Sequence, residues 1–360
     1  MKEKILVAMS GGVDSSVAAW LMKEQGYDVV GVSMHLVSCH RPTERSCCSA
    51  EDRLDARRVC EALGIPYFTL DYRDAFQKKV IQPFVAAYAR GRTPIPCVSC
   101  NSEFKFAALF DDMVLHEAVR VATGHYAKVL RDSDGRYRLY RGRDQKKDQT
   151  YFLFQLRQQE LSKIEFPLAE VTKAEVRAMA KKQGFVTQDK PESQEICFVT
   201  DDDYAGFVES HGGHLLQGEG NFVDREGKVL GRHEGIHAYT IGQRRGLKKG
   251  FGQRMYVVEI RPETNEVVLG LKQEVMRSTM TVTSMHWTAE GATTFDPREY
   301  VETPLEIRIR STHAPAVASI KSIRERIIEV AFDEPQMAIA PGQAAVFYQG
   351  DEVLGGGWIA

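Results

Sequence analysis

A glycine-rich loop lies between two apolar stretches near the start of the chain. Residues 5–9 form an apolar run, Ser10–Ser16 read Ser-Gly-Gly-Val-Asp-Ser-Ser, and apolar residues return at 17–22. This order predicts a strand, a tight turn and a helix, because two glycines permit a close backbone approach. The unpaired amides of the turn, the helix dipole and the serine hydroxyls together form a binding site for an anion such as phosphate. Asp14 in that site indicates a Mg²⁺ ion between its carboxylate and the phosphates.

The loop differs from the two common nucleotide-binding motifs. A Walker A loop, with its lysine after the second glycine, is found nowhere in the chain, and the loop does not read G-x-G-x-x-G. It resembles instead the PP-loop, S-G-G-x-D-S-[ST], of ATP pyrophosphatases, which adenylate a substrate and release pyrophosphate. A glycine turn that only caps a helix is the structural alternative. The predicted ATP-binding residues are Ala8, Met9, Ser10, Gly11, Gly12, Val13, Asp14 and Ser15, with Met34 and Gly124.

Strand and helix patterns alternate through the first half of the chain. Strands are predicted at 5–9, 29–34, 67–70 and 120–123, and helices at 50–63, 77–90 and 103–117. This rhythm predicts an α/β fold with a doubly wound parallel sheet that binds ligands at the carboxyl ends of its strands. Met34 and Gly124 fall at such ends. Further along, Asp134-Gly135 predicts a β-hairpin, and the capping box from Thr172 to Glu175 predicts a helix over 172–182.

Length and charge limit the class of protein. The chain has 360 residues, which is too long for one ordinary domain. Its 47 basic and 49 acidic residues give a net charge of −2, so any surface that attracts nucleic acid must be local. No apolar run approaches the roughly 18 residues of a membrane-spanning helix, and the N-terminus shows no signal-peptide pattern. We therefore expect a cytoplasmic protein without a membrane partner.

The cysteines carry a second signal. There are seven of them, an odd number that fits a reducing compartment better than a disulfide scaffold. Cys97 and Cys100 form a Cys-x-x-Cys pair after a proline-stiffened loop, and Cys100 lies at the start of a predicted helix, whose dipole should lower its thiol pKa. The pair is open to redox, zinc and Fe–S readings. A zinc site needs two more ligands, and the nearby candidates match no standard spacing; they are Cys39, His40, Cys47 and Cys48.

The second half of the chain has a different texture. From Arg232 to Arg254 there are six basic residues against Glu234 alone, with Tyr239 and Gln243 between them. We interpret this stretch as a local basic patch for RNA, with a solvated loop as the alternative. From about residue 280, short strands separated by Pro and Gly predict a small antiparallel barrel. The predicted domains are a catalytic domain at 1–206, a basic, RNA-contacting linker domain at 207–273 and the barrel at 274–360.

Several motifs in fixed order resemble one known family along nearly the whole chain. Besides the PP-loop, they are Cys47-Cys48-Ser49, Gly91–Pro94, Cys100-Asn101 with Phe104–Phe106, Thr123–Ala127, Lys147–Gln149, Ser193–Phe198 and Tyr239–Arg244. The family is that of the tRNA-specific 2-thiouridylases, MnmA. The resemblance implies an enzyme, a tRNA sulfurtransferase. It would use ATP with Mg²⁺ to adenylate the wobble uridine at its C2 oxygen, and would replace that oxygen with sulfur from a cysteine persulfide.

The resemblance also assigns roles to residues. Cys197 would carry the persulfide, and Cys100 would be the nucleophile that forms a transient disulfide with it. The implied tRNA contacts are Lys147, Asp148, Gln149, Arg244, Arg245, Arg308 and Ile309. The implied partners are tRNAs for Lys, Glu and Gln and a sulfur-donor protein, such as a cysteine desulfurase or a sulfur-relay protein.

The chain departs from the family pattern in two places. Many members have Asn-Pro-Asp where this chain has Ile95-Pro96-Cys97, and Ile309 stands where the family has a tyrosine, so a stacking contact is lost. With the extra thiol, the ligands of a [4Fe–4S] cluster with one open iron would be Cys97, Cys100 and Cys197. Two other hypotheses remain. One is another adenylating PP-loop enzyme, such as an amidating ligase or a tRNA lysidine synthetase; the other is a nonenzymatic RNA-binding protein.

Overall fold

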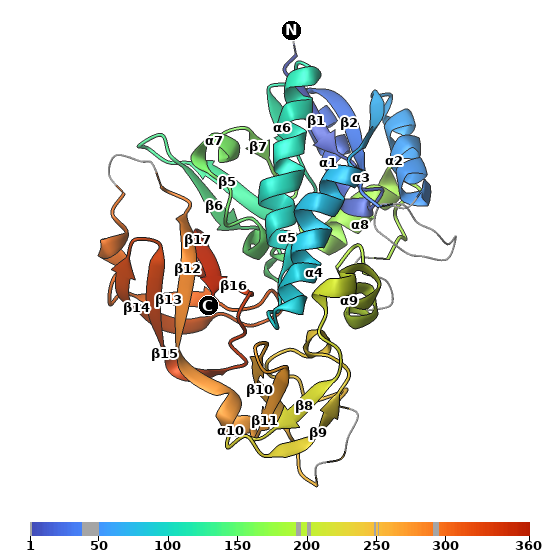
Figure 1. Ribbon diagram of the computed structural model, residues 1–360. Coiled ribbons are helices and arrows are strands. Elements are labelled where there is room, and N and C mark those ends of the chain that lie inside the picture. Colours follow the sequence, from blue (N-terminus) through green and yellow to red (C-terminus); the bar gives the residue numbers. More distant parts are fainter. Residues whose placement is uncertain are drawn as a thin grey trace.

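The computed structural model describes residues 2–37, 50–191, 196–199, 203–247, 250, 252–290 and 295–360. Its N-terminal part is built on a five-stranded parallel sheet of order β3-β2-β1-β4-β7 (Figure 1). The strands are β1 (Lys4–Ala8), β2 (Asp28–His35), β3 (Tyr67–Asp71), β4 (Arg120–Ala122) and β7 (Ile164–Glu165). The four predicted strands and their parallel sheet are confirmed, and β7 is an addition at one edge.

Helices cover both faces of this sheet, because successive strand residues point to opposite sides. Ile5 and Val7 face the helices α1 (Val13–Glu24), α2 (Ala50–Leu63) and α8 (Lys173–Lys182), while Leu6 faces α6 (Phe106–Leu115). The remaining helical elements of this part are α3 (Arg73–Phe76), η1 (Gln77–Ile81), α4 (Gln82–Ala89), α5 (Pro96–Ser99), η2 (Cys100–Lys105), η3 (Gln145–Lys147), η4 (Thr150–Phe152) and α7 (Gln158–Leu161).

Two predicted helices are organised differently from expectation. The helix predicted at 77–90 begins four residues earlier, with α3 at Arg73, and passes through the π-helical turn η1 into α4. The helix predicted to begin at 103 begins at Pro96, whose fixed φ favours the first helical position. It continues through η2, also π-helical, into α6. Cys100 therefore lies within a helical segment rather than at its start, which corrects the sequence prediction.

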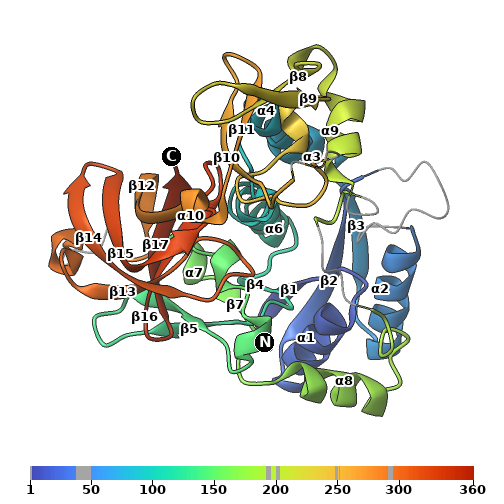
Figure 2. The same cartoon turned by 90° about the horizontal axis from the view of Figure 1, so that it is seen from below.

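The middle part of the chain is a small mixed sheet. Its strands have the order β10-β11-β8-β9, and β11 pairs in parallel with β8. Their bounds are β8 (Gly220–Val223), β9 (Val229–His233), β10 (Tyr256–Arg261) and β11 (Glu266–Gly270). The helical elements nearby are α9 (Tyr204–Gly212), η5 (Gly213–Leu215), η6 (Ile236–Ala238) and α10 (Lys272–Val275). Helix α4 ends against this part, so the sheet of the first part and this small sheet are linked (Figures 1 and 2).

The C-terminal part is a closed antiparallel barrel, as predicted. Six strands run in the order β12-β15-β14-β13-β16-β17, and pairing of β12 with β17 closes the barrel. They are β12 (Met276–Trp287), β13 (Pro304–Arg308), β14 (Ala316–Arg324), β15 (Ile327–Met337), β16 (Ala344–Gln349) and β17 (Glu352–Ile359), with the short helix η7 (Pro297–Tyr300). Aliphatic and aromatic side chains from all six strands fill its interior.

The predicted hairpin around Gly135 is present, but it belongs to two parts of the molecule at once. Strands β5 (Ala127–Arg131) and β6 (Tyr137–Arg141) pair with each other. Strand β6 also pairs with β17 of the barrel, with Leu139 opposite Val353. The hairpin thus extends the barrel sheet to eight strands. Within the described residues, no helix is long and apolar enough to cross a membrane.

Candidate functional site

The PP-loop connects β1 to α1 at the carboxyl edge of the parallel sheet. Gly11 has a φ of +75°, which favours glycine, and a Cβ there would lie 2.1 Å from the carbonyl oxygen of Asp52 on α2. The hydroxyl oxygens of Ser10 and Ser15 lie 3.2 Å apart, and the amide of Ser10 donates to the Ser15 hydroxyl at the same distance. The loop is therefore folded tightly on itself, with α2 packed against its turn.

The other residues predicted to bind ATP surround this loop. Ala8 ends β1, Met9 is buried beside it, and Val13 begins α1. Gly124 lies after β4, and a Cβ there would be 2.8 Å from the amide nitrogen of Ser15, so only glycine fits against the loop. Met34 is half-buried near the end of β2. The structure thus gathers all ten predicted ATP-binding residues around the carboxyl ends of β1, β2 and β4.

Asp14 has two partners that the sequence did not indicate. Both of its carboxylate oxygens accept hydrogen bonds from Lys173 Nζ, at 2.7 and 2.8 Å, and the Tyr126 hydroxyl donates to Oδ1 at 2.8 Å. Lys173 lies at the first turn of α8, and its side chain is only 11% exposed. Its position in sequence was interpreted only as part of a capping box, which is present as predicted. No spacing rule links Lys173 to the PP-loop.

Cys100 and Cys197 belong to one apolar cluster although they are far apart in sequence. Cys100 is buried, and Cys197 is partly buried against the same group of side chains. The ring of Phe198 packs edge-on against Phe76 and Phe84, with centroids 5.6 and 5.2 Å away, and so holds the segment at Cys197. Met34 near the end of β2 contacts this cluster as well. The predicted nucleophile and persulfide carrier therefore lie in one cluster near the strand that neighbours β1.

The segment that leads to Cys197 is tied to the helix that supports the PP-loop. Lys190 Nζ lies 2.6 Å from Asp52 Oδ1 and 2.8 Å from Asp55 Oδ2, both on α2. Arg177 on α8 donates to the carbonyl oxygens of Gln188 and Lys190 at 3.0 and 3.2 Å. The same end of α2 that packs on Gly11 thus fixes the start of the cysteine-bearing segment.

Burial keeps the thiols protonated. Desolvation raises the pKa of Cys100 to about 11, opposed by the nearby Lys105. Burial, with a contribution from negative charge on Cys197 and Cys100, raises the pKa of Cys97 to about 12. The expectation that a helix start would lower the Cys100 pKa is therefore wrong. Because Cys197 raises the pKa of both Cys97 and Cys100, and Cys100 raises that of Cys97, the three thiols lie within electrostatic range of one another.

Two further titratable groups lie near the cysteines. Lys105, at the end of the π-helical turn that begins at Cys100, lowers the pKa of Cys100 and Cys97 through its charge. His125, after β4, accepts or donates a hydrogen bond of 2.7 Å between its Nδ1 and Thr123 Oγ1. Burial lowers the pKa of His125 to about 3, so its ring is neutral at physiological pH. Lys105 was noted only as part of a family motif.

The sequence predicted candidate sites for Mg²⁺, for a [4Fe–4S] cluster and for zinc. Across the described ranges, no group of three or more His, Cys, Asp or Glu side chains is arranged to hold a metal ion. Cys97, Cys100 and Cys197 thus do not fit the [4Fe–4S] cluster predicted as an alternative. Both oxygens of Asp14, the predicted Mg²⁺ ligand, accept hydrogen bonds from Lys173. The zinc candidates Cys39, His40, Cys47 and Cys48, and the motif residues Ser193–Glu195, lie outside the described residues.

Three of the residues predicted to contact tRNA form hydrogen bonds inside the protein; they are Asp148, Gln149 and Arg308. Asp148 Oδ2 accepts a 2.6 Å hydrogen bond from Arg308 Nη1, and the two side chains are 3% and 13% exposed. The Gln149 side chain accepts from the amide of Tyr126 at 3.0 Å. Lys147, half-buried, ends the turn η3. The pair of Asp148 and Arg308 therefore joins the catalytic part to the barrel.

The remaining predicted tRNA contacts separate into exposed and buried groups. Arg244 and Arg245 are exposed after η6. Ile309 is 1% exposed and lies in the barrel core, so its side chain cannot contact RNA as predicted. Tyr239 is 4% exposed and packs edge-on against Phe222, so it is not available for base stacking. Of the predicted basic patch, Lys248 and Lys249 lie outside the described residues.

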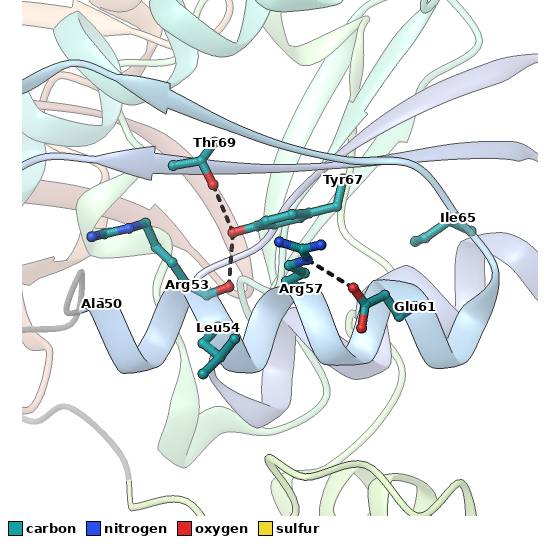
Figure 3. A pocket seen from close by; sticks show the side chains of 8 residues that line it. All are labelled: Ala50, Arg53, Leu54, Arg57, Glu61, Ile65, Tyr67 and Thr69. Atoms are coloured by element: carbon teal, nitrogen blue, oxygen red, sulfur yellow. Dashed lines mark hydrogen bonds and ion pairs between the residues drawn. The ribbon is translucent and has the colours of Figure 1, made fainter.

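A surface groove of about 600 Å³ lies between α2 and the edge strand β3 (Figure 3). Arg53, Leu54 and Arg57 line it from the helix, and Tyr67 and Thr69 line it from the strand. The Tyr67 hydroxyl donates to the Arg53 carbonyl oxygen at 3.1 Å and accepts from Thr69 Oγ1 at 3.1 Å. The groove includes none of the predicted site residues.

Known proteins match this chain in three consecutive pieces and as a whole. A tRNA methyl transferase HUP domain matches residues 3–201, a tRNA methyl transferase PRC-barrel domain matches 206–271, and an aminomethyltransferase beta-barrel domain matches 277–359. A solved 4-thiouridine synthetase–RNA complex with bound ATP is 17% identical and covers 59% of this chain and 51% of that chain. Its TM-score of 0.35 is too low to support an argument.

Full-length relatives are much more similar. The tRNA-specific 2-thiouridylase MnmA of Carboxydothermus hydrogenoformans is 48% identical over 99% of this chain and 98% of its own length. The protein of the same name from Geobacter metallireducens is 45% identical over 99% of this chain and 97% of its own. With such identity over nearly its whole length, the chain belongs to the family of tRNA-specific 2-thiouridylases.

Proposed function

We propose that this protein is a tRNA uridine 2-sulfurtransferase that activates the wobble uridine with ATP and replaces its C2 oxygen with sulfur. The observation that carries the proposal is the place of Cys100 and Cys197. The two cysteines share one apolar cluster near the end of β2, and the PP-loop follows the neighbouring strand β1. An ATP site and a pair of thiols therefore meet at one edge of the sheet.

Activation uses the PP-loop. The C2 oxygen of uracil is a poor leaving group, so it must first attack the α-phosphorus of ATP and release pyrophosphate. The loop amides and the hydroxyls of Ser10 and Ser15 bind the phosphates, and Lys173 lies beside them as the nearby cation. Mg²⁺ would enter with the ATP phosphates, and Asp14 and the phosphate oxygens would hold it while it neutralises their charge. Met34 packs against the adenine ring.

Sulfur transfer uses the two thiols. Cys197 receives a terminal sulfur from a sulfur-donor protein and becomes a persulfide. The Cys100 thiolate attacks Sγ of Cys197, the persulfide S–S bond breaks, and the two cysteines are left as a disulfide. The terminal sulfur, free as sulfide or already bonded to C2, replaces the former C2 oxygen, which leaves with AMP. A thiol reductant then returns the disulfide to two thiols.

Protonation of Cys100 has a consequence for this step. Its pKa of about 11 makes the resting thiol a poor nucleophile. The proton must leave when substrate binds, and the charge of Lys105 favours the thiolate that remains. Burial until then protects the thiol from unproductive oxidation. Cys97 has no role in this scheme, and no step passes through an Fe–S cluster.

RNA binding is proposed for the exposed surface that remains. Arg244 and Arg245 are placed to contact phosphates, whereas Asp148 and Arg308 hold the catalytic part and the barrel together, and Gln149 bonds to Tyr126 within the catalytic part. The expected substrates are the tRNAs for Lys, Glu and Gln. The matched HUP domain supplies the ATP site, and the middle and barrel domains would orient the anticodon stem-loop over it.

The test measures two products of one reaction. Purified protein is incubated with a tRNA transcript, ATP and a persulfide donor, and pyrophosphate release and 2-thiouridine are quantified. Cys100→Ser and Cys197→Ser are expected to abolish 2-thiouridine while RNA-dependent pyrophosphate release continues. Cys60→Ala, which changes a buried core thiol away from the site, is the control and should retain both. RNA-dependent pyrophosphate release by the wild-type protein and both serine variants, with no 2-thiouridine formed by any of them, would instead identify another adenylating PP-loop enzyme. Absence of RNA-dependent pyrophosphate release would favour an RNA-binding protein.

A further inference from the structure

One segment of the barrel reaches the loop that precedes the cysteines. This segment, Pro341–Ala344, leads into β16. The carbonyl oxygen of Pro341 accepts from the amide of Thr93 at 2.9 Å, and Gln343 Nε2 donates to the carbonyl oxygen of Thr93 at 3.0 Å. Gln343 is 8% exposed, so its amide is a buried donor that the Thr93 carbonyl satisfies. Both backbone groups of Thr93 are thereby held by the barrel.

The barrel and the loop that precedes the cysteines approach each other closely at Gly342. Gly342 has a φ of +93°, and a Cβ there would lie 3.1 Å from the Thr93 carbonyl oxygen and 3.2 Å from Arg92 Cβ. From the other side, the Thr93 hydroxyl donates to Thr240 Oγ1 of the middle domain at 3.3 Å. Thr93 is thus the point at which the catalytic, middle and barrel parts meet. Four residues further along the chain, the helical segment reaches Cys97.

The same barrel segment also supports the far side of the cysteine-bearing helix. The Tyr151 hydroxyl, which is fully buried, donates to the carbonyl oxygen of Ala344 at 2.8 Å. The next residue, Phe152, offers its carbonyl oxygen to Asn101 Nδ2 at 3.5 Å. Asn101 directly follows Cys100. Neighbouring barrel residues, Gln343 and Ala344, therefore contact structure on both sides of the Cys97–Cys100 segment.

We propose that Gln343 is a positioning residue for sulfur transfer, through which the barrel sets the place of Cys100. The proposal rests on the proposed function. Attack of one thiol on another requires the two sulfurs to be aligned at close range, and a misplacement of about 1 Å can cost on the order of 100-fold in rate. Adenylation takes place at the PP-loop, which Gln343 does not contact. Loss of the Gln343 contact should therefore slow the second half of the reaction and spare the first.

The test replaces the donor without changing the shape of the side chain. Gln343→Met retains the length of the side chain and removes the N–H that Thr93 uses. We expect kcat for 2-thiouridine formation to fall about 10- to 100-fold, with pyrophosphate release and the KM for tRNA unchanged. Alkylation of Cys100, followed by mass spectrometry, should change in rate. Gln336→Met is the matched control, since that amide donates to the carbonyl oxygen of Glu334 on the same strand, β15.

A second variant guards against a folding defect. Tyr151→Phe removes one hydroxyl from the other side of the segment and should give the same split between adenylation and sulfur transfer. The proposal is overturned if Gln343→Met leaves thiolation unchanged, or if pyrophosphate release and thiolation fall together. A rise in tRNA KM alone would also overturn it and would identify Gln343 as an RNA contact. Failure of the wild-type protein to form 2-thiouridine refutes the proposed function instead, whatever the variants do.

Discussion

Lys173 Nζ lies within 2.8 Å of both carboxylate oxygens of Asp14, although the two residues are 159 positions apart in the chain. The PP-loop contains no basic residue, whereas a Walker A loop carries its own lysine. In this protein the first turn of α8 places a cation against the loop. The Tyr126 hydroxyl bonds to the same carboxylate and so fixes the orientation of Asp14.

Lys173→Met should therefore impair adenylation. The change leaves Asp14 without its cation and removes positive charge beside the phosphates, so kcat/KM for ATP in pyrophosphate release should fall at least about tenfold. Pyrophosphate release with saturating tRNA measures this directly. Lys181→Met, on an exposed position of the same helix, is the control. Equal activity of the two variants would show that Lys173 only stabilises the fold.

The reactivity of Cys100 should rise steeply with pH, because burial raises its thiol pKa, whereas the sequence predicted a lowered pKa. With the pKa of Cys100 raised to about 11, its thiolate fraction at pH 7 is very small and rises about tenfold per pH unit. Its alkylation by iodoacetamide should follow this slope from pH 7 to 9.5, as read by peptide mass spectrometry. A plateau already reached near pH 7 would show a lowered pKa.

The raised pKa values of Cys97 and Cys100 also make the stability of the fold depend on pH. Because burial raises the folded-state pKa above that of the unfolded chain, the folded protein binds more protons at high pH. The stability that comes from the neutral Cys97 and Cys100 is fully present below about pH 8.5, the pKa of an unperturbed cysteine. It is lost as the pH rises toward 11–12.

Cys97→Ser should leave thiolation intact, since no step of the reaction uses Cys97.

Asp148→Asn should act on stability more than on RNA affinity. The change removes the charge from a carboxylate that is 3% exposed and leaves Arg308 buried without its partner. Breaking a buried pair in this way costs about 3–5 kcal/mol, which chemical denaturation would measure. The double variant Asp148→Asn/Arg308→Met should recover part of that loss. If tRNA binding weakens while the unfolding midpoint stays constant, Asp148 contacts RNA as the sequence first indicated.

Arg244→Gln and Arg245→Gln should weaken tRNA binding through phosphate contacts. Each lost contact should lower the slope of log affinity against log salt by roughly 0.7 to 0.9. Titrations of fluorescent tRNA at several salt concentrations give that slope. Arg57→Gln, at the outer groove near β3, is the control (Figure 3). An unchanged slope for both Arg244 and Arg245 variants would place the RNA on another face.

Local patterns predicted those features that depend on neighbouring residues. Three features depend only on residues close together in sequence, and the structure has all of them. They are the strand before Ser10, the capping box of Thr172 and Glu175, and the turn at Asp134-Gly135. Strand β7 was missed because its two residues are too few to show alternation. The Cys100 pKa was misjudged because burial, which raises it, depends on side chains that lie elsewhere in the chain.

Contacts between distant residues were beyond reach of such patterns. Lys173 was visible only as part of a capping box, and the burial of Ile309 and Tyr239 depends on strands that lie elsewhere in the chain. The family resemblance supplied the roles of Cys100 and Cys197, which spacing alone does not connect. It also suggested RNA contacts at Asp148 and Gln149, whose side chains the fold uses internally.

The hairpin β5–β6 has a consequence for anyone who exchanges parts between relatives. Because β6 forms backbone hydrogen bonds with β17, the cut predicted at residue 274 does not separate two independent pieces. In a chimera that takes only residues 274–360 from another species, the β17 strand of that species would have to pair with β6 of this protein at Leu139 and Tyr140. A truncation at the same place would leave β6 as an open edge, which is prone to aggregation. The transplantable unit is the barrel together with residues 127–141.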